Sequence, residues 1–199
     1  MRAVRAELLS GIDLYREVVL HRLVSARESV WISTANVKAM FVEHGGSFRS
    51  VVEIFEELAA RGVDLRLLHA ELPSRPFRAA FDRSRRLTKG GLALRICPRV
   101  HFKAVLIDGA WAYLGSANLT GAGLGAKGVD RRNFELGFVT EDFEVIARVS
   151  ALYESIWKGA ECANCRLRRE CPDPIGPAAP TSEKVRLGRS RRLEMHQWK

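Results

Sequence analysis

Strand-like and helix-like segments alternate along roughly the first ninety residues of the chain. The segments 2–26, 47–61 and 76–89 are typical of helices, whereas 29–37 and 64–69 are typical of buried strands. A serine at the start of the second helical segment is expected to cap it, and glycines follow the second and third. This alternation predicts an α/β fold, in which helices cover a central sheet.

Further along the chain the pattern changes to successive strands. Strand-like segments lie at 92–96, 101–118 and 133–140, and a last helix is expected after Asp142, ending near Trp157. The composition then shifts to a cysteine-containing segment and a strongly basic tail. We therefore expect two parts, a main domain and a C-terminal appendage, spanning 1–158 and 159–199.

The segment 101–118 is predicted to be a β-hairpin. Asp108 and Gly109 stand between two apolar runs, and this dipeptide is a strong signal for a two-residue turn. Such a turn pairs Ile107 with Ala110. A loop of three residues would instead shift the register by one and reverse the faces of one strand.

The predicted register gathers four chemically active side chains on one face of the hairpin. Counting outward from the turn places Ser116 opposite His101, and Lys103 and Asn118 share their face because side chains alternate along a strand. Directly paired residues lie within cross-strand reach of each other. Asp108 falls on the opposite face, so we interpret it as a turn residue that supports the fold.

These four groups suit chemistry at phosphorus. An imidazole attacks as a nucleophile or donates a proton. An ammonium, a hydroxyl and a carboxamide bind non-bridging oxygens and stabilise charge in the transition state. The set does not resemble a group of metal ligands, so the sequence predicts phosphoryl transfer without a catalytic metal.

The spacing of these residues resembles the extended HKD motif of the phospholipase D superfamily, and the similarity covers about residues 25–158. The matching positions are His101-x-Lys103-x4-Asp108-x6-Gly115-Ser116-x-Asn118. The resemblance implies a layered sandwich, with a central mixed sheet flanked by helices on both sides. It also implies an acidic residue that supports the histidine, for which Glu135 is the candidate.

The resemblance further implies a homodimer. The family's enzymes pair two motifs about a two-fold axis: one histidine attacks to form a phosphohistidine, and the other protonates the leaving oxygen and then activates water. This chain has one motif, so a second copy would supply the other half of the site. The remaining histidines lack the residues that follow His101 in the motif; they are His21, His44, His69 and His196.

Each candidate also has a purely structural interpretation. His101 would then be a core histidine and Lys103 a solvated strand residue. Ser116 and Asn118 would be turn residues that lead into the glycine-rich loop. The joint spacing of all four favours the catalytic interpretation.

The cysteines form a second constellation. A CxxC pair and a third cysteine follow the last helix, and a fourth lies just before the hairpin; they are Cys162, Cys165, Cys171 and Cys97. This arrangement predicts a structural metal site, either an iron–sulphur cluster or zinc. Its spacing is similar to that of the iron–sulphur site of RecB-like nucleases. Disulfides or free thiols remain open alternatives.

The formal net charge of +9 and the isoelectric point of about 9.9 indicate an anionic partner. Charge alone does not separate DNA, RNA and acidic lipid, and an arginine-rich surface is also typical of thermophilic proteins. The C-terminal tail is interpreted as a phosphate-binding arm or as a solvated terminus. Its candidate substrate-binding residues are Arg186, Arg189, Arg191 and Arg192.

The sequence has no apolar run long enough to span a membrane, and acidic residues interrupt its N-terminal segment, so we expect a cytoplasmic protein. The leading hypothesis is a metal-independent endonuclease that cleaves DNA or RNA. Short members of the superfamily with one motif resemble endonucleases. The alternatives are a phospholipid phosphodiesterase or phosphatidyl transferase, and an inactive nucleic-acid-binding module.

Overall fold

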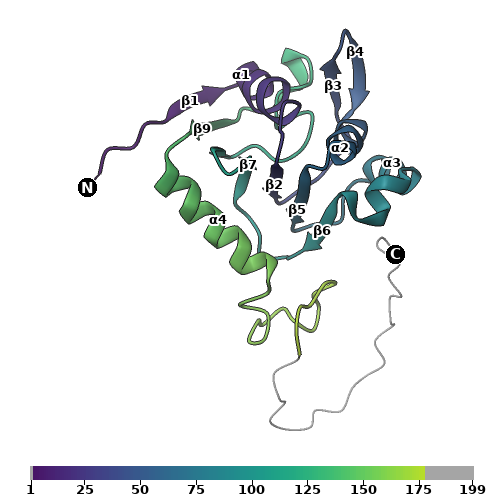
Figure 1. Cartoon of the computed structure of the whole chain (residues 1–199), viewed down its shortest axis with the longest axis vertical. Coiled ribbons are helices and arrows are strands. Elements are labelled where there is room, and N and C mark those ends of the chain that lie inside the picture. The colour runs from purple at the N-terminus through teal and green to yellow at the C-terminus, as the bar shows by residue number, and fades with distance from the viewer. Residues whose placement is uncertain (1, 178–199) are drawn as a thin grey trace.

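The computed structural model describes residues 2–177, and Figure 1 shows the arrangement of its elements. Seven strands form one sheet in the order β1-β9-β8-β7-β2-β5-β6, and β3 and β4 form a separate hairpin. The strands are β1 (Glu7–Ser10), β2 (Ser29–Thr34), β3 (Phe41–His44), β4 (Ser47–Ser50), β5 (Asp64–His69), β6 (Ala93–Ile96), β7 (Lys103–Ile107), β8 (Trp111–Gly115) and β9 (Leu136–Thr140). The helices are α1 (Ile12–Leu14), the π-helical η1 (Tyr15–Leu23), α2 (Val51–Ala60), α3 (Arg75–Arg83), the π-helical η2 (Leu87–Gly91), the 3-10 helix η3 (Val129–Arg131) and α4 (Phe143–Trp157).

The sheet is mixed. β2, β5 and β6 run parallel, as the helical crossovers between them require. β7 pairs antiparallel with β2, and β8, β9 and β1 continue the sheet in antiparallel pairs. The predicted α/β fold with a central mixed sheet is therefore confirmed.

Helices cover both faces of this sheet (Figure 1). On one face η1, α2 and α3 pack with Val105, Ile107 and Trp111 in the larger hydrophobic core. On the other face α4 packs over Leu68 and Leu106 in a smaller core. α4 begins as predicted, because the Asp142 carboxylate accepts hydrogen bonds from the backbone nitrogens of the first helical turn, at 3.1 Å each.

The helix predicted at 2–26 is wrong in its first half. β1 occupies Glu7–Ser10 and pairs with β9, and the helix begins only at Ile12. Gly11, at φ 56°, makes the turn between the two elements. Of the β1 residues only Leu9 is buried, and its neighbours on both sides are exposed. Such alternation along the chain is typical of a strand rather than of a helix.

The second helix also begins later than predicted. Gly45 and Gly46 both have positive φ and close a hairpin, which places Ser47 in strand β4. Ser50 is the actual cap: its hydroxyl accepts a hydrogen bond from the backbone nitrogen of Val52 at 3.3 Å. The helix then ends at Ala60, close to the predicted position.

The helix predicted at 76–89 divides at Ser84. The backbone of this residue is extended, and its hydroxyl accepts a hydrogen bond from the nitrogen of Leu87 at the start of η2. The strand predicted at 64–69 has these bounds in the structure, and the other predicted strands lie within their segments but are shorter. Within residues 2–177, no helix combines the length and the apolar character needed to cross a membrane.

Candidate active site

The register of the β7–β8 hairpin differs from the prediction by one residue. Ile107 pairs with Trp111, so the loop holds three residues and Ala110 is its exposed last member. Trp111 is buried in the same core as Ile107, and burial of such a side chain contributes about 1.5–3 kcal/mol. This gain favours Trp111 over Ala110 as the cross-strand partner of Ile107. Lys103 consequently lies opposite Gly115, and Ser116 is not the cross-strand partner of His101.

The topology nevertheless brings the motif residues to one edge of the sheet. β2 ends at this edge, and β7 starts there because it runs antiparallel to β2. β8 ends and β9 starts at the same edge, since Lys103, Gly115 and Gly137 are paired in a row. His101 lies two residues before β7 and Ser116 directly after β8. The candidate residues therefore lie together along this edge of the sheet and not on one face of the hairpin.

Ser116 and Glu135 are in direct contact. The Ser116 hydroxyl donates a short hydrogen bond to the Glu135 carboxylate and accepts one from the nitrogen of Leu136 at 3.2 Å. The Asn133 amide donates to the other oxygen of Glu135 at 3.1 Å. Glu135 is thus held between the motif serine and Asn133. Glu135 is predicted to support His101, and the contacts that the structure gives for its carboxylate are with Ser116 and Asn133.

Asn118 anchors the segment that follows β2. Its side-chain oxygen accepts hydrogen bonds from the Thr34 hydroxyl and from the backbone nitrogens of Ala35 and Asn36, at 3.1, 3.1 and 3.2 Å. Because three donors occupy this oxygen, the amide NH₂ is the part of the side chain suited to binding a substrate oxygen. Polar residues directly after a buried parallel strand are where α/β sheets commonly bind ligands.

A polar pocket adjoins Asn118, with a volume of about 320 Å³. Two lysines line it, Lys38 after β2 and Lys127 in the glycine-rich loop, together with Asn36 and Asn133. Sequence reasoning missed both lysines, because each belongs to a loop whose path the strand pattern does not fix. Their ammonium groups give the pocket the positive charge that an anionic ligand requires.

His101 and Lys103 complete the motif. His101 is exposed, and Lys103 at the start of β7 is partly buried. The Lys103 ammonium donates a hydrogen bond to the backbone oxygen of His101 at 2.8 Å, so the lysine folds over the residue that leads into the strand. Because His101 is exposed, its imidazole is accessible to a substrate at the sheet edge.

Tyr113 and two glycines shape the turn after β8. The buried Tyr113 hydroxyl accepts a hydrogen bond from the nitrogen of Ala117 at 3.2 Å, and burial, with a smaller contribution from Glu135, raises its pKa to about 12. A Cβ atom at Gly115 or Gly137 would collide with the Tyr113 ring. The motif glycine is therefore required by the tyrosine that packs beneath it.

Asp108 lies at the far end of β7 from the site. Its carboxylate accepts hydrogen bonds from the backbone nitrogens of Arg27, Glu28 and Ser29, at 2.8 to 3.1 Å. Its φ of 54° also allows the tight hairpin loop. Asp108 thus ties the hairpin to the start of β2, in agreement with its interpretation as a structural residue.

We expect Asp108→Ala to lower the free energy of unfolding by about 2–4 kcal/mol, because three backbone donors lose a charged acceptor and φ becomes strained. Turnover per folded molecule should stay near that of the wild type. Urea denaturation and activity at a temperature where both proteins are folded would check this. Asp130→Ala, at an exposed site, is the matched control. A large loss of turnover with unchanged stability would contradict the structural role.

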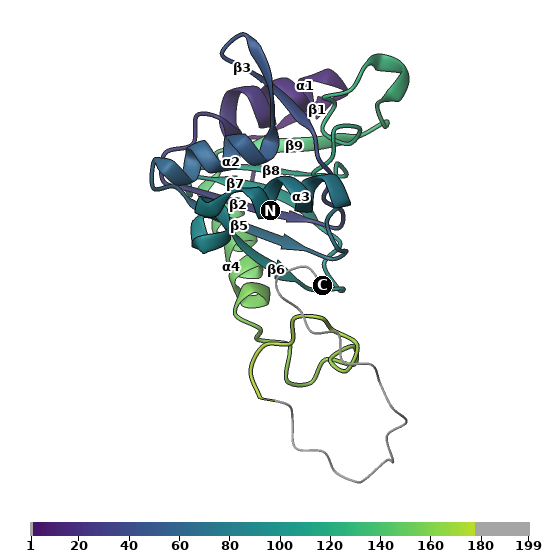
Figure 2. The ribbon, with the colours of Figure 1, turned by 90° about the vertical axis from the view of Figure 1, so that its right-hand side faces the viewer.

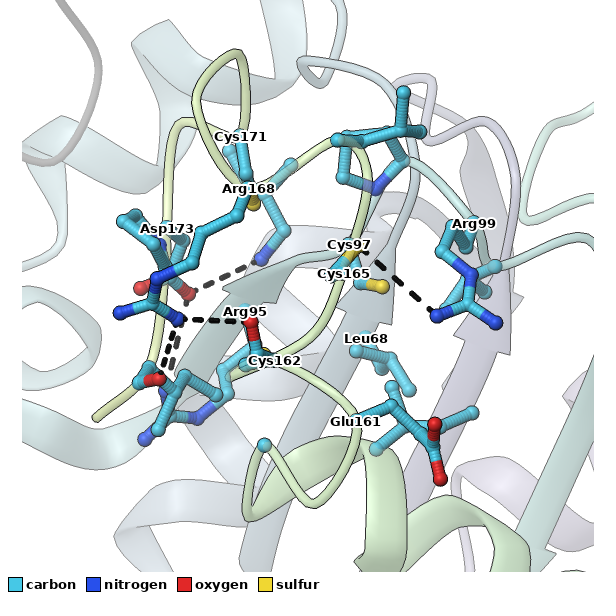
Figure 3. A pocket seen from close by; sticks show the side chains of 18 of the residues that line it. Leu68, Arg95, Cys97, Arg99, Glu161, Cys162, Cys165, Arg168, Cys171 and Asp173 are labelled. Carbon is cyan, nitrogen blue, oxygen red and sulfur yellow. Dashed lines mark hydrogen bonds and ion pairs between the residues drawn. The ribbon is translucent and has the colours of Figure 1, made fainter. Parts of the chain in front are cut away.

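The four cysteines line one cavity with a volume of about 200 Å³, and all four are free thiols (Figure 3). Among residues 2–177, no three His, Cys, Asp or Glu side chains stand around one point as the ligands of a single ion do. The basic-tail candidates Arg186, Arg189, Arg191 and Arg192 lie outside the described residues. The domain boundary near 158 remains a prediction; within residues 2–177, α4 is the last element of regular secondary structure.

Comparisons with known proteins identify the family and the fold. A family model described as "Cardiolipin synthase, PLD-like domain" matches residues 19–157. The fold is similar to that of Nuc from Salmonella typhimurium, a phospholipase D family member, with a TM-score of 0.54, 18% identity, and coverage of 77% of this chain and 95% of Nuc. NucT from Helicobacter pylori gives a TM-score of 0.51 at 18% identity, with coverage of 78% and 96%.

A third solved structure extends the comparison to a different enzyme. Polyphosphate kinase from Porphyromonas gingivalis has a TM-score of 0.51 at 15% identity, and the match covers 85% of this chain and 27% of the kinase. No curated protein sequence matches the chain. At these identities the structural likeness establishes the fold.

Proposed function

Because the chain belongs to the phospholipase D-like family of cardiolipin synthase domains, within a superfamily of phosphodiesterases, we propose that it hydrolyses phosphodiester bonds in DNA or RNA. The observation that carries this proposal is that His101, Lys103, Ser116 and Asn118 all lie at the strand ends along one edge of the sheet, beside a pocket lined by two lysines. The charge of +9 adds long-range attraction for a polyanion.

In the proposed reaction, an imidazole nitrogen of one His101 attacks phosphorus and forms a phosphohistidine. The bond from phosphorus to the leaving oxygen breaks, and that oxygen takes a proton from His101 of the second subunit. Water then attacks the phosphorus of the phosphohistidine and gives a proton to the same second histidine. The bond between phosphorus and the first histidine breaks, and this step releases the phosphate and restores both imidazoles. In both steps the nucleophilic, acidic and basic groups of the protein are His101 side chains.

The other motif residues bind the phosphate. Lys103 and the Asn118 amide stabilise the charge that develops on the non-bridging oxygens. Ser116 is held by Glu135, so its orientation is fixed before substrate binds. Lys38 and Lys127 line the pocket beside Asn118, and in this arrangement they would bind a neighbouring phosphate of the same nucleic-acid strand. Glu135 is a positioning residue in this arrangement.

An exposed apolar surface beside the site supports the proposed homodimer. Phe138 of β9 and its cross-strand partner Leu8 of β1 are half exposed, and Leu136 lies two residues away on the same face of β9. Phe134, which is fully exposed, directly precedes Glu135. Contiguous exposed apolar surface of this kind typically marks a protein interface. A second copy that covers it would bring its own sheet edge toward the first.

This surface gives a testable prediction. Phe134→Glu combined with Phe138→Glu should shift the protein from dimer to monomer, because two charges would be buried at the interface. Sedimentation velocity measures the change, and activity should fall in parallel. Phe143→Glu, at another exposed phenylalanine, is the matched control. Double-variant monomers with full activity would contradict the composite site.

A phospholipid substrate is the second candidate, because the matching family model is named for cardiolipin synthase. The same histidine chemistry would act on a headgroup phosphodiester, with an alcohol or water as the acceptor. The exposed apolar surface near the site would then face lipid.

One assay separates the two candidates. The protein would be incubated with labelled single- and double-stranded DNA, RNA, and vesicles containing phosphatidylglycerol, each in excess chelator. We expect cleavage of nucleic acid, tolerance of the chelator, and no lipid turnover. Turnover of lipid with intact nucleic acid would support the second candidate instead. Binding of DNA without cleavage, equal in wild type and His101→Ala, would indicate an inactive binding module.

A further inference from the structure

The cysteines come together from distant parts of the chain. Cys97 follows β6 directly, while the other three belong to the segment after α4. All four cysteines of the sequence line the same cavity, which lies against β6 and the end of α4 (Figure 3). Figure 2 shows this segment beside the end of β6. The fold thus collects every thiol of the chain in one place.

The segment after α4 has little structure of its own to hold it there. Residues 158–177 contain no helix or strand and instead form successive turns. The Arg168 guanidinium closes the segment on itself, donating to the carbonyl oxygens of Cys162 and Ile175 at 3.0 and 2.9 Å. The Asp173 carboxylate accepts a hydrogen bond from the nitrogen of Ile96 at 3.3 Å, which joins it to β6. Segments of this length without secondary structure are commonly stabilised by a metal or by disulfides.

Cationic side chains lie among the cysteines. The Arg99 guanidinium lies 4.0 Å from the Cys165 sulphur, and Arg95 and Arg168 also line the cavity. Positive charge of this kind offsets the negative charge of a centre with four thiolate ligands. Burial raises the pKa of the Cys171 thiol, and the nearby Cys97 and Cys162 add to this rise, so a metal would have to displace the thiol proton on binding.

We propose that Cys97, Cys162, Cys165 and Cys171 bind a thiophilic metal centre through four thiolates. The chemical class is an iron–sulphur cluster or a zinc ion, both of which take four cysteine ligands. The four cysteines line one cavity, but among the described residues no three of them stand around one point as the ligands of a single ion do. The ligands of a cluster lie farther apart than those of one ion, so a cluster would require a smaller movement of the segment. Iron and inorganic sulphide are therefore the expected occupants.

The centre would fasten the appendage to the catalytic domain next to the site. Cys97 precedes His101 by four residues, and the turn between them is closed by a hydrogen bond from the nitrogen of Val100 to the oxygen of Cys97, at 2.9 Å. Fixing Cys97 would therefore hold the backbone that leads into β7. The metal has no part in the proposed hydrolysis, so its presence is tested separately from activity.

The full chain purified without oxygen provides the test. We expect iron and acid-labile sulphide in equal amounts with visible absorption, or else stoichiometric zinc, and slow reaction of the thiols until the protein is denatured. Four thiols should then titrate, because the chain has four cysteines. Four rapidly reacting thiols in native, metal-free protein would overturn the proposal, as would disulfides without metal.

A variant pair tests the ligands. Cys165→Ser should lose the centre, whereas Asn164→Ser, at the exposed neighbouring residue, should keep it. If Cys165→Ser does not fold, the wild-type protein serves: metal removal by chelator should lower the melting temperature by about 5 °C or more, and reconstitution should restore it. A melting temperature that is unchanged by removal of all metal would refute a structural centre.

Discussion

Replacing His101 with alanine should reduce phosphodiester cleavage by about 10⁴-fold or more. The substitution removes the nucleophile of one subunit and the proton donor of the other, and general acid–base catalysis alone contributes about 10²–10⁴-fold. His101 is exposed and lies outside both hydrophobic cores, so the fold should be unaffected. Single-turnover rates on a labelled oligonucleotide, with thermal melting alongside, measure both effects.

The control for this experiment is His21→Ala. His21 is exposed on η1 and pairs with Glu17 there, away from the sheet edge that carries the motif. Its replacement should leave the rate within about twofold of the wild type, as expected of a surface substitution. Residual cleavage by His101→Ala at a tenth of the wild-type rate would exclude the histidine from the chemistry.

Asn118→Asp should lower turnover by about 10²–10³-fold with little change in stability. The aspartate keeps an oxygen to accept the three hydrogen bonds from Thr34, Ala35 and Asn36. It loses the NH₂ donors and adds a negative charge beside the substrate phosphate, and the loss of one transition-state donor is typically worth this factor. The measurements are kcat on a nucleic-acid substrate and the free energy of unfolding.

Asn118→Ala separates the two roles of this residue. It leaves three backbone and hydroxyl donors without their acceptor, so the free energy of unfolding should fall by about 1–3 kcal/mol in addition to the loss of activity. If the alanine and aspartate variants had equal free energies of unfolding, the contacts of the Asn118 oxygen would contribute nothing to stability. Full activity of Asn118→Asp would exclude the amide as a phosphate ligand.

The order of helices and strands was largely predictable, since it depends on local periodicity and on glycines that end helices. Errors arose where two local signals compete. Ser47 and Ser50 are both suitable caps, and only the Gly45-Gly46 turn, which creates the β3–β4 hairpin, decides between them. The segment of β1 was assigned to a helix because its pairing with β9 is a contact across more than a hundred residues.

The hairpin register shows a second limit of sequence reasoning. The dipeptide Asp108-Gly109 indicated a two-residue turn, but the choice between Ala110 and Trp111 as the partner of Ile107 depends on core packing. The four candidate catalytic residues of the motif still lie at one edge of the sheet, because the topology brings the ends of β2, β7, β8 and β9 together there. Lys38 and Lys127 could not be found from spacing, since their loops approach the site only in the folded chain.

The most direct test of the central claim uses mixed dimers. Wild-type chains and His101→Ala chains carrying different tags would be expressed together, and heterodimers isolated through both tags. Each heterodimer would hold one His101 instead of two, so a shared site predicts cleavage at least about a hundredfold below the wild type. Heterodimers with half the wild-type activity would show that each subunit works alone and would contradict the account.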